Sequence, residues 1–292
     1  ATRTVQMQSC AMSGAGTCAP AGGYSTVSTT GTYPSLTYAG ATGNCYQFQY
    51  LVSDNVSNTA TYPTGSVICL DTVAPSAIAV SIAGAATYTT SAAITLTTAA
   101  TDGASGVSQM QFSCDNSTWT TAESYVTSKS FNLTSQSGAG CTAAEGTKYV
   151  YAKYKDAAGS WSVATSDTII LDTLAPSTGS ISWTTPTNNP APTLTLLSTD
   201  ATSGMSQMKF SCNNTAWSTP VTYATGYSAF NINTGAGCST GDGAKTIYVQ
   251  FSDLAGNWSS SYSQAGTLDT AAPGAPTLTC TIYTDNVWVN ST

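Results

Sequence analysis

Cysteine is the residue type with the clearest chemistry in this chain, because its positions repeat. Cys114 and Cys141 recur as Cys212 and Cys238, and the second member of each pair ends the motif Ser/Thr-Gly-Ala-Gly-Cys. Since both members repeat together, we predict the disulfides Cys114–Cys141 and Cys212–Cys238 and an oxidising compartment. In the chain-entropy account, each bond stabilises its unit by about 3–4 kcal/mol. Two buried thiols or a metal pair is the alternative, although the chain has no His to complete a site.

The other cysteines include one that has no obvious partner. A segment Ser-Gly-Ala-Gly-Thr-Cys that ends at Cys18 echoes the repeated motif, which favours a Cys10–Cys18 bond. Cys45 and Cys69 flank a predicted hairpin almost symmetrically, so we expect them to bridge it. The total of nine cysteines is odd, which leaves Cys280 free, bonded to another molecule, or with a partner outside this sequence.

Residues used in acid–base catalysis are scarce. The chain contains no His, so Ser-His and Cys-His nucleophile pairs are unavailable. Its only Glu residues, Glu123 and Glu145, form no recognisable acid/base pair. No phosphate-binding loop, dinucleotide fingerprint or zinc motif occurs in the sequence. We therefore expect no enzymatic activity and no cofactor.

The aspartates recur in two settings. They begin either a D-T-x-A-P junction (Asp71, Asp172 and Asp269) or a D-x-A-G turn (Asp156 and Asp253). We interpret these carboxylates as caps of backbone N–H groups. Calcium at the junctions is the alternative, with Asp102 or Asp200 joining a linker Asp. One or two carboxylates fall short of the roughly six to eight oxygens that calcium takes.

Tryptophan and asparagine offer two routes to carbohydrate. The tryptophans that recur at fixed places in the units are Trp119, Trp161, Trp217 and Trp258. Their repetition favours packing in the core or at a strand edge over a carbohydrate-binding platform. The Asn-x-Ser/Thr sequons begin at Asn55, Asn116, Asn132, Asn213, Asn257 and Asn290. Several fall at predicted loops, so we expect Asn-linked glycosylation in a competent host, with Ser/Thr-linked sugars equally open.

Composition limits the partners of the chain. The formal net charge is −7, and Lys and Arg together number only seven. So few cations cannot build the basic surface that binds nucleic acid. No apolar run approaches the ~18 residues of a membrane-spanning helix, so we expect no membrane insertion. Hydrophobic residues reach 41%, which argues against disorder.

The elements that position these residues are strands that repeat about every hundred residues, the size of a small β domain. Residues 106–119 read GVSQMQFSCDNSTW, and residues 204–217 read GMSQMKFSCNNTAW. Residues 77–82 and 94–98 alternate as strands do. The later strands place apolar residues on one face, namely Val150, Ala152 and Tyr154 in one unit and Ile247, Val249 and Phe251 in the next. We find no amphipathic helical segment, so the units are predicted to be all-β.

The D-T-x-A-P junction, the strand that ends in D-x-A-G-[SN]-W and the unit length together resemble the bacterial Ig-like repeats of large surface proteins and adhesins. The resemblance covers two complete units, roughly 72–269, and half of a third. It implies an all-β fold of tandem Ig-like Greek-key β-sandwich domains, two complete and one incomplete, and an extracellular or cell-surface location for a secreted protein. Ig-type repeats host many functions, so the fold alone does not settle the role.

The two ends of the chain depart from the repeat. We predict an incomplete Ig-like domain at 1–71, complete domains at 72–172 and 173–269, and a strand segment at 270–292 that completes a neighbouring domain. In the first of these, Val5 to Cys10 loosely resembles Gln109 to Cys114, and residues 46–54 resemble residues 149–156. The two strands that precede these in a complete unit are missing.

Residues 274–292 look like those two missing strands. We expect them to meet another copy of the chain through Leu278, Cys280, Ile282, Val287, Trp288 and Val289. Our hypothesis is a structural subunit of an extracellular filament, assembled head to tail by donor-strand complementation, with Cys280 bonded to a cysteine of the acceptor. An unfilled sandwich exposes a groove and bare sheet edges, which is the physical motive. The alternatives are an excerpt of a longer tandem adhesin or stalk, and a module that binds cell-surface glycans or another partner.

Overall fold

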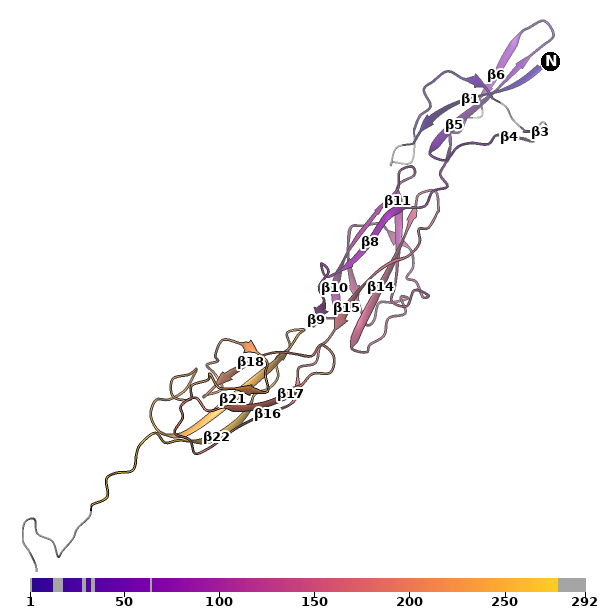
Figure 1. The fold of residues 1–292 in the computed structure, drawn as a ribbon. Coiled ribbons are helices and arrows are strands. Elements are labelled where there is room, and N and C mark those ends of the chain that lie inside the picture. The colour runs from indigo at the N-terminus through magenta and orange to yellow at the C-terminus, as the bar shows by residue number, and fades with distance from the viewer. Residues whose placement is uncertain (1, 13–17, 28–29, 33–34, 64, 278–292) are drawn as a thin grey trace, which may run out of the picture. The chain divides into compact units, whose positions relative to one another are not determined.

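The computed structural model describes residues 2–12, 18–27, 30–32, 35–63 and 65–277 of the 292-residue chain. These residues form β-strands joined by turns, and they contain no helix. The chain divides into two compact units, Ala1–Leu174 and Ala175–Thr292 (Figure 1). The boundary falls inside the junction that begins at Asp172. A helix long and apolar enough to cross a membrane was not found in the described part of the chain.

Residues 76–171 of the first unit form a two-sheet β-sandwich, here called the central sandwich. One sheet has the order β13 (Ser128–Asn132), β10 (Ala93–Thr101), β8 (Ser76–Ile82). The other has the order β12 (Glu123–Ser124), β11 (Val107–Ser113), β14 (Gly146–Asp156), β15 (Thr165–Leu171), β9 (Tyr88–Thr89). The chain crosses from the first sheet to the second between β8 and β9, where β9 runs parallel to β15. The first strand of the sandwich is thus divided into two parts, with β8 at the edge of one sheet and β9 at the edge of the other, as in Ig-like folds.

The core of the central sandwich follows from the alternation seen in the sequence. Met110 and Phe112 of β11 and Val150, Ala152 and Tyr154 of β14 are at most 1% exposed. The residues of the facing sheet that cover them are Val80, Ile82, Ile94 and Leu96, from β8 and β10. Because successive side chains point to opposite faces of a strand, every second residue enters this core.

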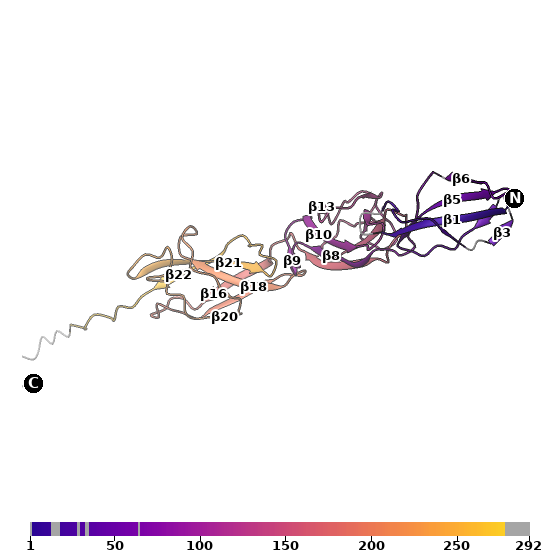
Figure 2. The same cartoon turned by 90° about the horizontal axis from the view of Figure 1, so that it is seen from above.

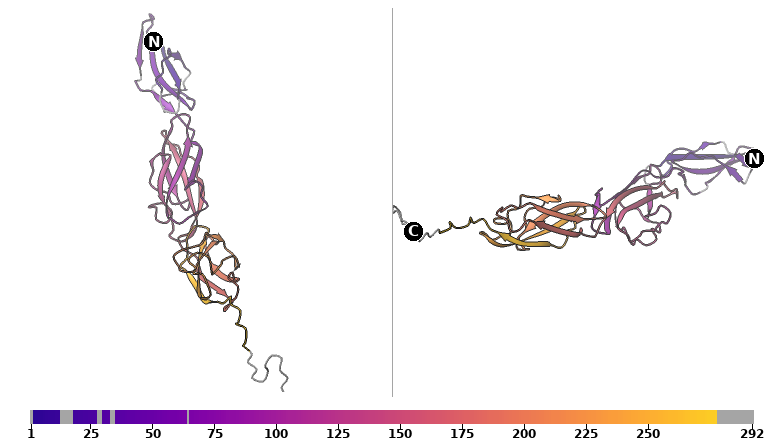
Figure 3. Two further views of the ribbon diagram at one scale, coloured as in Figure 1. Left: turned by 90° about the vertical axis from the view of Figure 1, so that its left-hand side faces the viewer. Right: turned by 60° about the horizontal axis from the view of Figure 1, so that its bottom comes forward.

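The second unit repeats this architecture. Its sheets have the orders β16 (Ser177–Trp183), β17 (Leu194–Thr199), β20 (Gly226–Tyr227) and β19 (Val221–Thr222), β18 (Met205–Ser211), β21 (Gly243–Asp253), β22 (Tyr262–Leu268). These orange-to-yellow strands pack into one body (Figure 3). The predicted inward residues Ile247, Val249 and Phe251 are fully buried. The fold is therefore a series of Ig-like β-sandwich domains.

The first 70 residues differ, because their strands form one principal sheet, here called the N-terminal sheet. It contains β2 (Ser25–Thr26), β1 (Thr2–Ala11), β5 (Asn44–Ser53) and β6 (Thr59–Pro63) in that order, with β7 (Ile68–Leu70) also paired to β5. β1, β5 and β6 lie side by side in Figure 2. A separate two-stranded sheet joins β3 (Thr30–Thr32) to β4 (Ser35–Thr37).

Strands β1 and β5 correspond to β11 and β14 of the central sandwich. The turn after β5 bonds Asp54 N to Asn58 O (3.0 Å), as the turn after β14 bonds Asp156 N to Ser160 O (3.1 Å). Counting back from these turns, the pair Val5–Tyr50 takes the place of Phe112–Ala152.

This correspondence differs from the loose sequence resemblance between residues 5–10 and residues 109–114. The sequence alignment matched Cys10 to Cys114 and so put Gln8, and not Val5, in the place of Phe112. That match does not hold in the folded strands, because Cys10 and Cys114 lie at different heights relative to the turns that follow β5 and β14. Among the residues that the structure describes, no strand covers the N-terminal sheet in the way that β8 and β10 cover β11 and β14.

Candidate functional site

The principal candidate site is an open groove of about 470 Å³ on the N-terminal sheet. Its lining is mostly apolar and aromatic: Val5, Leu36, Thr37, Tyr38, Gly40, Tyr46, Phe48, Tyr50, Ile68 and Leu70. Val5 comes from β1, and three of the aromatic residues come from alternate positions of β5. The groove therefore lies on one face of the sheet.

The groove face is the one that forms the core in the other domains. Phe48 and Tyr50 correspond to Val150 and Ala152, which β8 and β10 bury completely in the central sandwich. On the N-terminal sheet the same face is only partly covered, and Ile68 keeps 60% of its surface exposed. Covering an apolar face of this kind with a partner is favourable by about 25 cal/mol for each Å² of apolar surface removed from water.

The aromatic floor of the groove is fixed before any partner arrives. The ring of Tyr38 meets Tyr46 edge-on at 5.5 Å and Phe48 at 5.6 Å between centroids. The Tyr46 hydroxyl accepts a hydrogen bond from Ala41 N (2.7 Å) and donates one to Ala41 O (3.1 Å). Gly40 makes this approach possible, because a Cβ there would lie 2.9 Å from the Tyr46 ring. A preformed floor lowers the ordering cost of binding.

Four disulfides form, with the pairings expected from the sequence. The bonds are Cys10–Cys18, Cys45–Cys69, Cys114–Cys141 and Cys212–Cys238. Cys45–Cys69 links β5 to β7 and so closes one end of the groove-bearing sheet. Disulfides of this number are typical of proteins in oxidising compartments.

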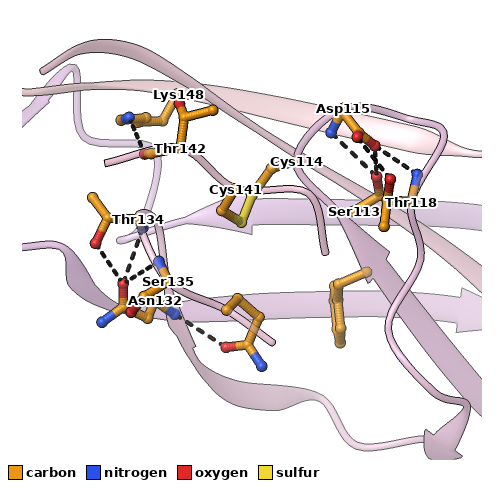
Figure 4. Close-up of a disulfide and its surroundings, with 12 residues drawn as sticks. Ser113, Cys114, Asp115, Thr118, Asn132, Thr134, Ser135, Cys141, Thr142 and Lys148 are labelled. Atoms are coloured by element: carbon orange, nitrogen blue, oxygen red, sulfur yellow. Dashed lines mark hydrogen bonds between the residues drawn. A yellow bond between two sulfur atoms is a disulfide. The ribbon is translucent and has the colours of Figure 1, made fainter. Parts of the chain in front are cut away.

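A buried lysine holds the loop of each sandwich disulfide, and the sequence analysis missed both lysines. Lys148 is 6% exposed, and its Nζ donates to Thr142 O (2.8 Å) beside the Cys114–Cys141 bond (Figure 4). Lys245 does the same in the second unit, where its Nζ donates to Ser239 O. The signal was a Lys at the same place in both repeats, at an inward-facing position of a strand.

The recurring tryptophans flank a lysine in each sandwich. Lys153 Nζ lies 4.2 Å from the ring centre of Trp119 and 5.2 Å from that of Trp161. In the central sandwich, Gln111 of β11 pairs with Lys153 of β14. In the second unit the lysine is on the other strand of the pair, since Lys209 of β18 pairs with Gln250 of β21.

Lys209 Nζ again lies between two tryptophans, 4.3 Å from the ring centre of Trp258 and 5.3 Å from that of Trp217. These rings therefore make intramolecular cation–π contacts, which supports the packing interpretation over an open carbohydrate platform. The exchange of Lys and Gln across the strand pair was visible in the sequence only once the register was known.

Several sequon asparagines serve as turn caps. Asn132 Oδ1 accepts from Thr134 N (2.9 Å) and Ser135 N (3.0 Å) (Figure 4), and Asn213 Oδ1 accepts from Thr215 N (3.0 Å). Asn257 Nδ2, the atom that would carry a sugar, donates to Asp253 Oδ2 (2.8 Å). Asn116 is exposed in a tight turn at φ +58°.

The other two sequons lie in different surroundings. Asn55 is exposed in the turn between β5 and β6. Asn290 lies outside the described residues, as do the predicted donor positions Leu278, Cys280, Ile282, Val287, Trp288 and Val289.

The junction and turn aspartates cap backbone N–H groups, as the sequence predicted. Asp71 Oδ1 accepts from Val73 N and its Oδ2 from Ser105 N, both at 3.0 Å. Burial raises the pKa of Asp71, but the hydrogen bonds from Ser105 and Val73 together bring that pKa below its ordinary value of 3.8.

The same structure also brings Asp71 close to two other aspartates. One carboxylate oxygen each from Asp71, Asp102 and Asp156 lies within 4.8 Å of the others. These three residues are the ones that could hold a metal ion in the first unit.

No protein-family model matches the chain, and no curated protein matches it. Among solved structures it is similar to a tetra-tandem repeat from the extending region of a large adhesion protein, with 17% identity and a TM-score of 0.28, covering 92% of this chain and 67% of that one. Fibronectin(III)-like modules of Clostridium thermocellum CbhA match with 13% identity and a TM-score of 0.38, covering 69% and 100%. A structure concerned with host cell surface retention of a 1.5-MDa bacterial ice-binding adhesin matches with 16% identity and a TM-score of 0.37, covering 91% and 85%.

Proposed function

We propose that the chain is a structural subunit of an extracellular fibre, in which the groove of the N-terminal sheet receives two strands from residues 274–292 of another copy. The observation that carries the proposal is the apolar groove itself. It lies on the face of the N-terminal sheet whose counterpart in the central sandwich is covered by strands β8 and β10. Strand addition to an open sandwich supplies both backbone hydrogen bonds and apolar side chains.

The spacing from each junction supports residues 274–292 as the donor. In the central sandwich, the core residues Val80 and Ile82 follow Pro75 at the fifth and seventh positions. In the second unit, the buried Ile181 and Trp183 follow Pro176 at the same positions. After Pro273 those positions hold Leu278 and Cys280. The donor therefore has the inward pattern of the first strand of a domain, and Val287 and Val289 repeat that alternation for a second strand.

The same spacing changes the role proposed for Cys280. At the place of Ile82 its side chain would enter the acceptor core, in a position that is fully buried in the central sandwich. All the other cysteines are paired within the chain. A bond between Cys280 and the acceptor would require thiol–disulfide exchange with one of these pairs. We therefore assign Cys280 an apolar packing role.

The experiment uses two variants that each damage one half of the joint. Leu278→Asp places a charge on the donor, and Ile68→Asp places a charge in the groove at a residue that is 60% exposed, so folding is preserved. Val163→Asp is the matched control, since Val163 is 80% exposed and does not line the groove. Assembly is followed by light scattering and electron microscopy over a range of concentrations.

Wild type and Val163→Asp are expected to form chains that lengthen with concentration, and each of the other two variants to stay monomeric. A mixture of Leu278→Asp and Ile68→Asp retains one intact donor and one intact groove, so it should give a one-to-one heterodimer and nothing longer. A wild-type chain that stays folded and monomeric at high concentration contradicts the proposal. That result favours the alternative in which strands of the same, longer polypeptide fill the groove, as in a tandem adhesin or stalk.

A further inference from the structure

Three carboxylates from separate elements meet in the first unit. Asp71 comes from the junction before β8, Asp102 from the loop after β10, and Asp156 from the last position of β14. One oxygen from each lies within 4.8 Å of the others. The salt bridge that the structure shows, between Lys129 and Glu123, does not involve these three carboxylates. Like charges this close repel one another strongly when partly removed from water.

Asp156 is the member whose charge is hardest to accommodate. Its side chain is 1% exposed. Oδ1 accepts hydrogen bonds from Gly159 N (2.6 Å) and Ser160 N (2.8 Å), which close the turn. Oδ2 is buried and has no hydrogen-bond partner among the described residues. A buried anionic oxygen without a partner is costly, so the site calls for a positive ligand.

The two corresponding turns of the chain satisfy this oxygen in another way. Asn58 Nδ2 donates to Asp54 Oδ2, and Asn257 Nδ2 donates to Asp253 Oδ2, both at 2.8 Å. The residue at the same position of the central turn is Ser160, whose side chain carries no amide. Of the three turns, the central one alone leaves its second carboxylate oxygen for something outside the turn.

We propose that Asp71, Asp102 and Asp156 bind a divalent cation of the calcium class. Carboxylate oxygens on loops suit Ca²⁺, which accepts irregular geometry and completes its shell with carbonyls and water. The other carboxylate contacts orient the site: Ser105 N donates to Asp71 Oδ2 (3.0 Å), and Gly106 N donates to Asp102 Oδ1 (2.7 Å). Bound calcium would tie the junction residue Asp71 to the two loops of the central sandwich. This proposal does not depend on the fibre.

The test is a calcium titration of the full chain after removal of metal with a chelator. Binding is read by calorimetry, and stability by the melting temperature at each Ca²⁺ concentration. We expect an affinity in the range of about 10⁻⁴–10⁻³ M known for extracellular modules, and a melting temperature that rises as the site fills.

Two variants locate the site. Asp156→Asn keeps the shape of the side chain and its turn acceptor but removes the charge, so it should lose one equivalent of bound Ca²⁺. Ser160→Asn keeps the carboxylate and supplies the amide donor found at Asn58 and Asn257, so it should weaken binding at least ~10-fold. The control is Asp54→Asn, which makes the same change in a turn whose Oδ2 already has a partner; it should titrate like wild type.

Three results would overturn the proposal. The first is an identical calcium titration for wild type, Asp156→Asn and Ser160→Asn. The second is an equal loss in Asp54→Asn, which would mean that the turn, and not the cluster, governs the response. The third is a response to Mg²⁺ as strong as that to Ca²⁺, which would refute the assignment to calcium.

Discussion

A single carboxylate, that of Asp115, organises the turn that follows β11. Its Oδ1 accepts from Ser117 N (2.8 Å) and Thr118 N (2.7 Å), and its Oδ2 from Thr118 Oγ1 (2.9 Å). The N–H groups of Thr118 and Ser117 favour the charged form and hold the pKa of Asp115 well below its ordinary value of 3.8. A carboxyl group with a depressed folded pKa stabilises the fold above its unfolded pKa, and this contribution is lost as the pH falls through the folded value.

Asp115→Asn is therefore expected to make the protein less sensitive to acid. Asn213 fills the same position in the second unit and accepts from Thr215 N (3.0 Å) and Ala216 N (2.9 Å), so the amide keeps the turn. Below pH 4, where the unfolded carboxyl begins to take up protons, the melting temperature of the variant should fall less steeply than that of wild type. Thermal melts between pH 6 and pH 2.5 test this. Parallel curves would show that Asp115 does not contribute to the acid response.

At the scale of the loop, the motif that ends at Cys141 is shaped by its last glycine. Gly140 has φ +70°, and a Cβ there would lie 2.2 Å from Asp115 Oδ2. Gly138 has nearly the same φ, +72°, but its Cβ would meet nothing closer than 3.7 Å. The second unit repeats the close approach, since a Cβ at Gly237 would lie 2.3 Å from Asn213 Oδ1. The last glycine is thus required for both its conformation and its contact.

These two glycines form a matched pair of substitutions. Gly138→Ala should cost about 1–2 kcal/mol, the price of a left-handed alanine. Gly140→Ala carries the same penalty and also displaces Asp115 from its turn, so we expect roughly twice that loss. Chemical denaturation midpoints, with equal m-values, measure both. Equal losses of stability in the two variants would mean that Asp115 can move away from the new Cβ without destabilising the fold.

Most of the longer strands of the two sandwiches were predictable, because their apolar residues alternate or because the segment occurs twice. Strand β9, of two residues, was not predicted, since it is too short to show a period and exists only through its pairing with β15. The match of β1 to β11 was wrong because it aligned Cys10 with Cys114, which lie at different heights in their strand pairs. Local pattern identified the elements, and long-range contacts fixed their partners.

The candidate sites were likewise predictable only in part from the sequence. The sequence suggested that the first domain lacks two strands, but not that Tyr38, Tyr46 and Phe48 form a packed floor. It also displayed the difference between Ser160 and its counterparts Asn58 and Asn257. What it did not display was that an amide at this position reaches the carboxylate, which depends on the geometry of the folded turn.

At the scale of the whole molecule, the cysteine pairing predicts how assemblies behave without reductant. Eight of the nine cysteines are paired within the chain, and in the proposed fibre Cys280 packs in the core of a neighbouring copy. We expect assemblies to separate into monomers, with at most a dimer joined through two Cys280 thiols, on denaturing gels run without reductant. Cys280→Ala should still assemble. A covalent ladder that this substitution abolishes would instead show that Cys280 exchanges with an acceptor disulfide.

The positions of the basic residues have a consequence for durability. All seven Lys and Arg residues of the chain lie within β-strands: Arg3, Lys129, Lys148, Lys153, Lys155, Lys209 and Lys245. Proteases that cut after basic residues act most readily at exposed loop tips, and here the loops contain no such residue. Digestion by these enzymes must wait until a strand leaves its sheet, an opening that costs much of the stability of the domain. The native chain thus protects the bonds after its six lysines from the proteases of its surroundings.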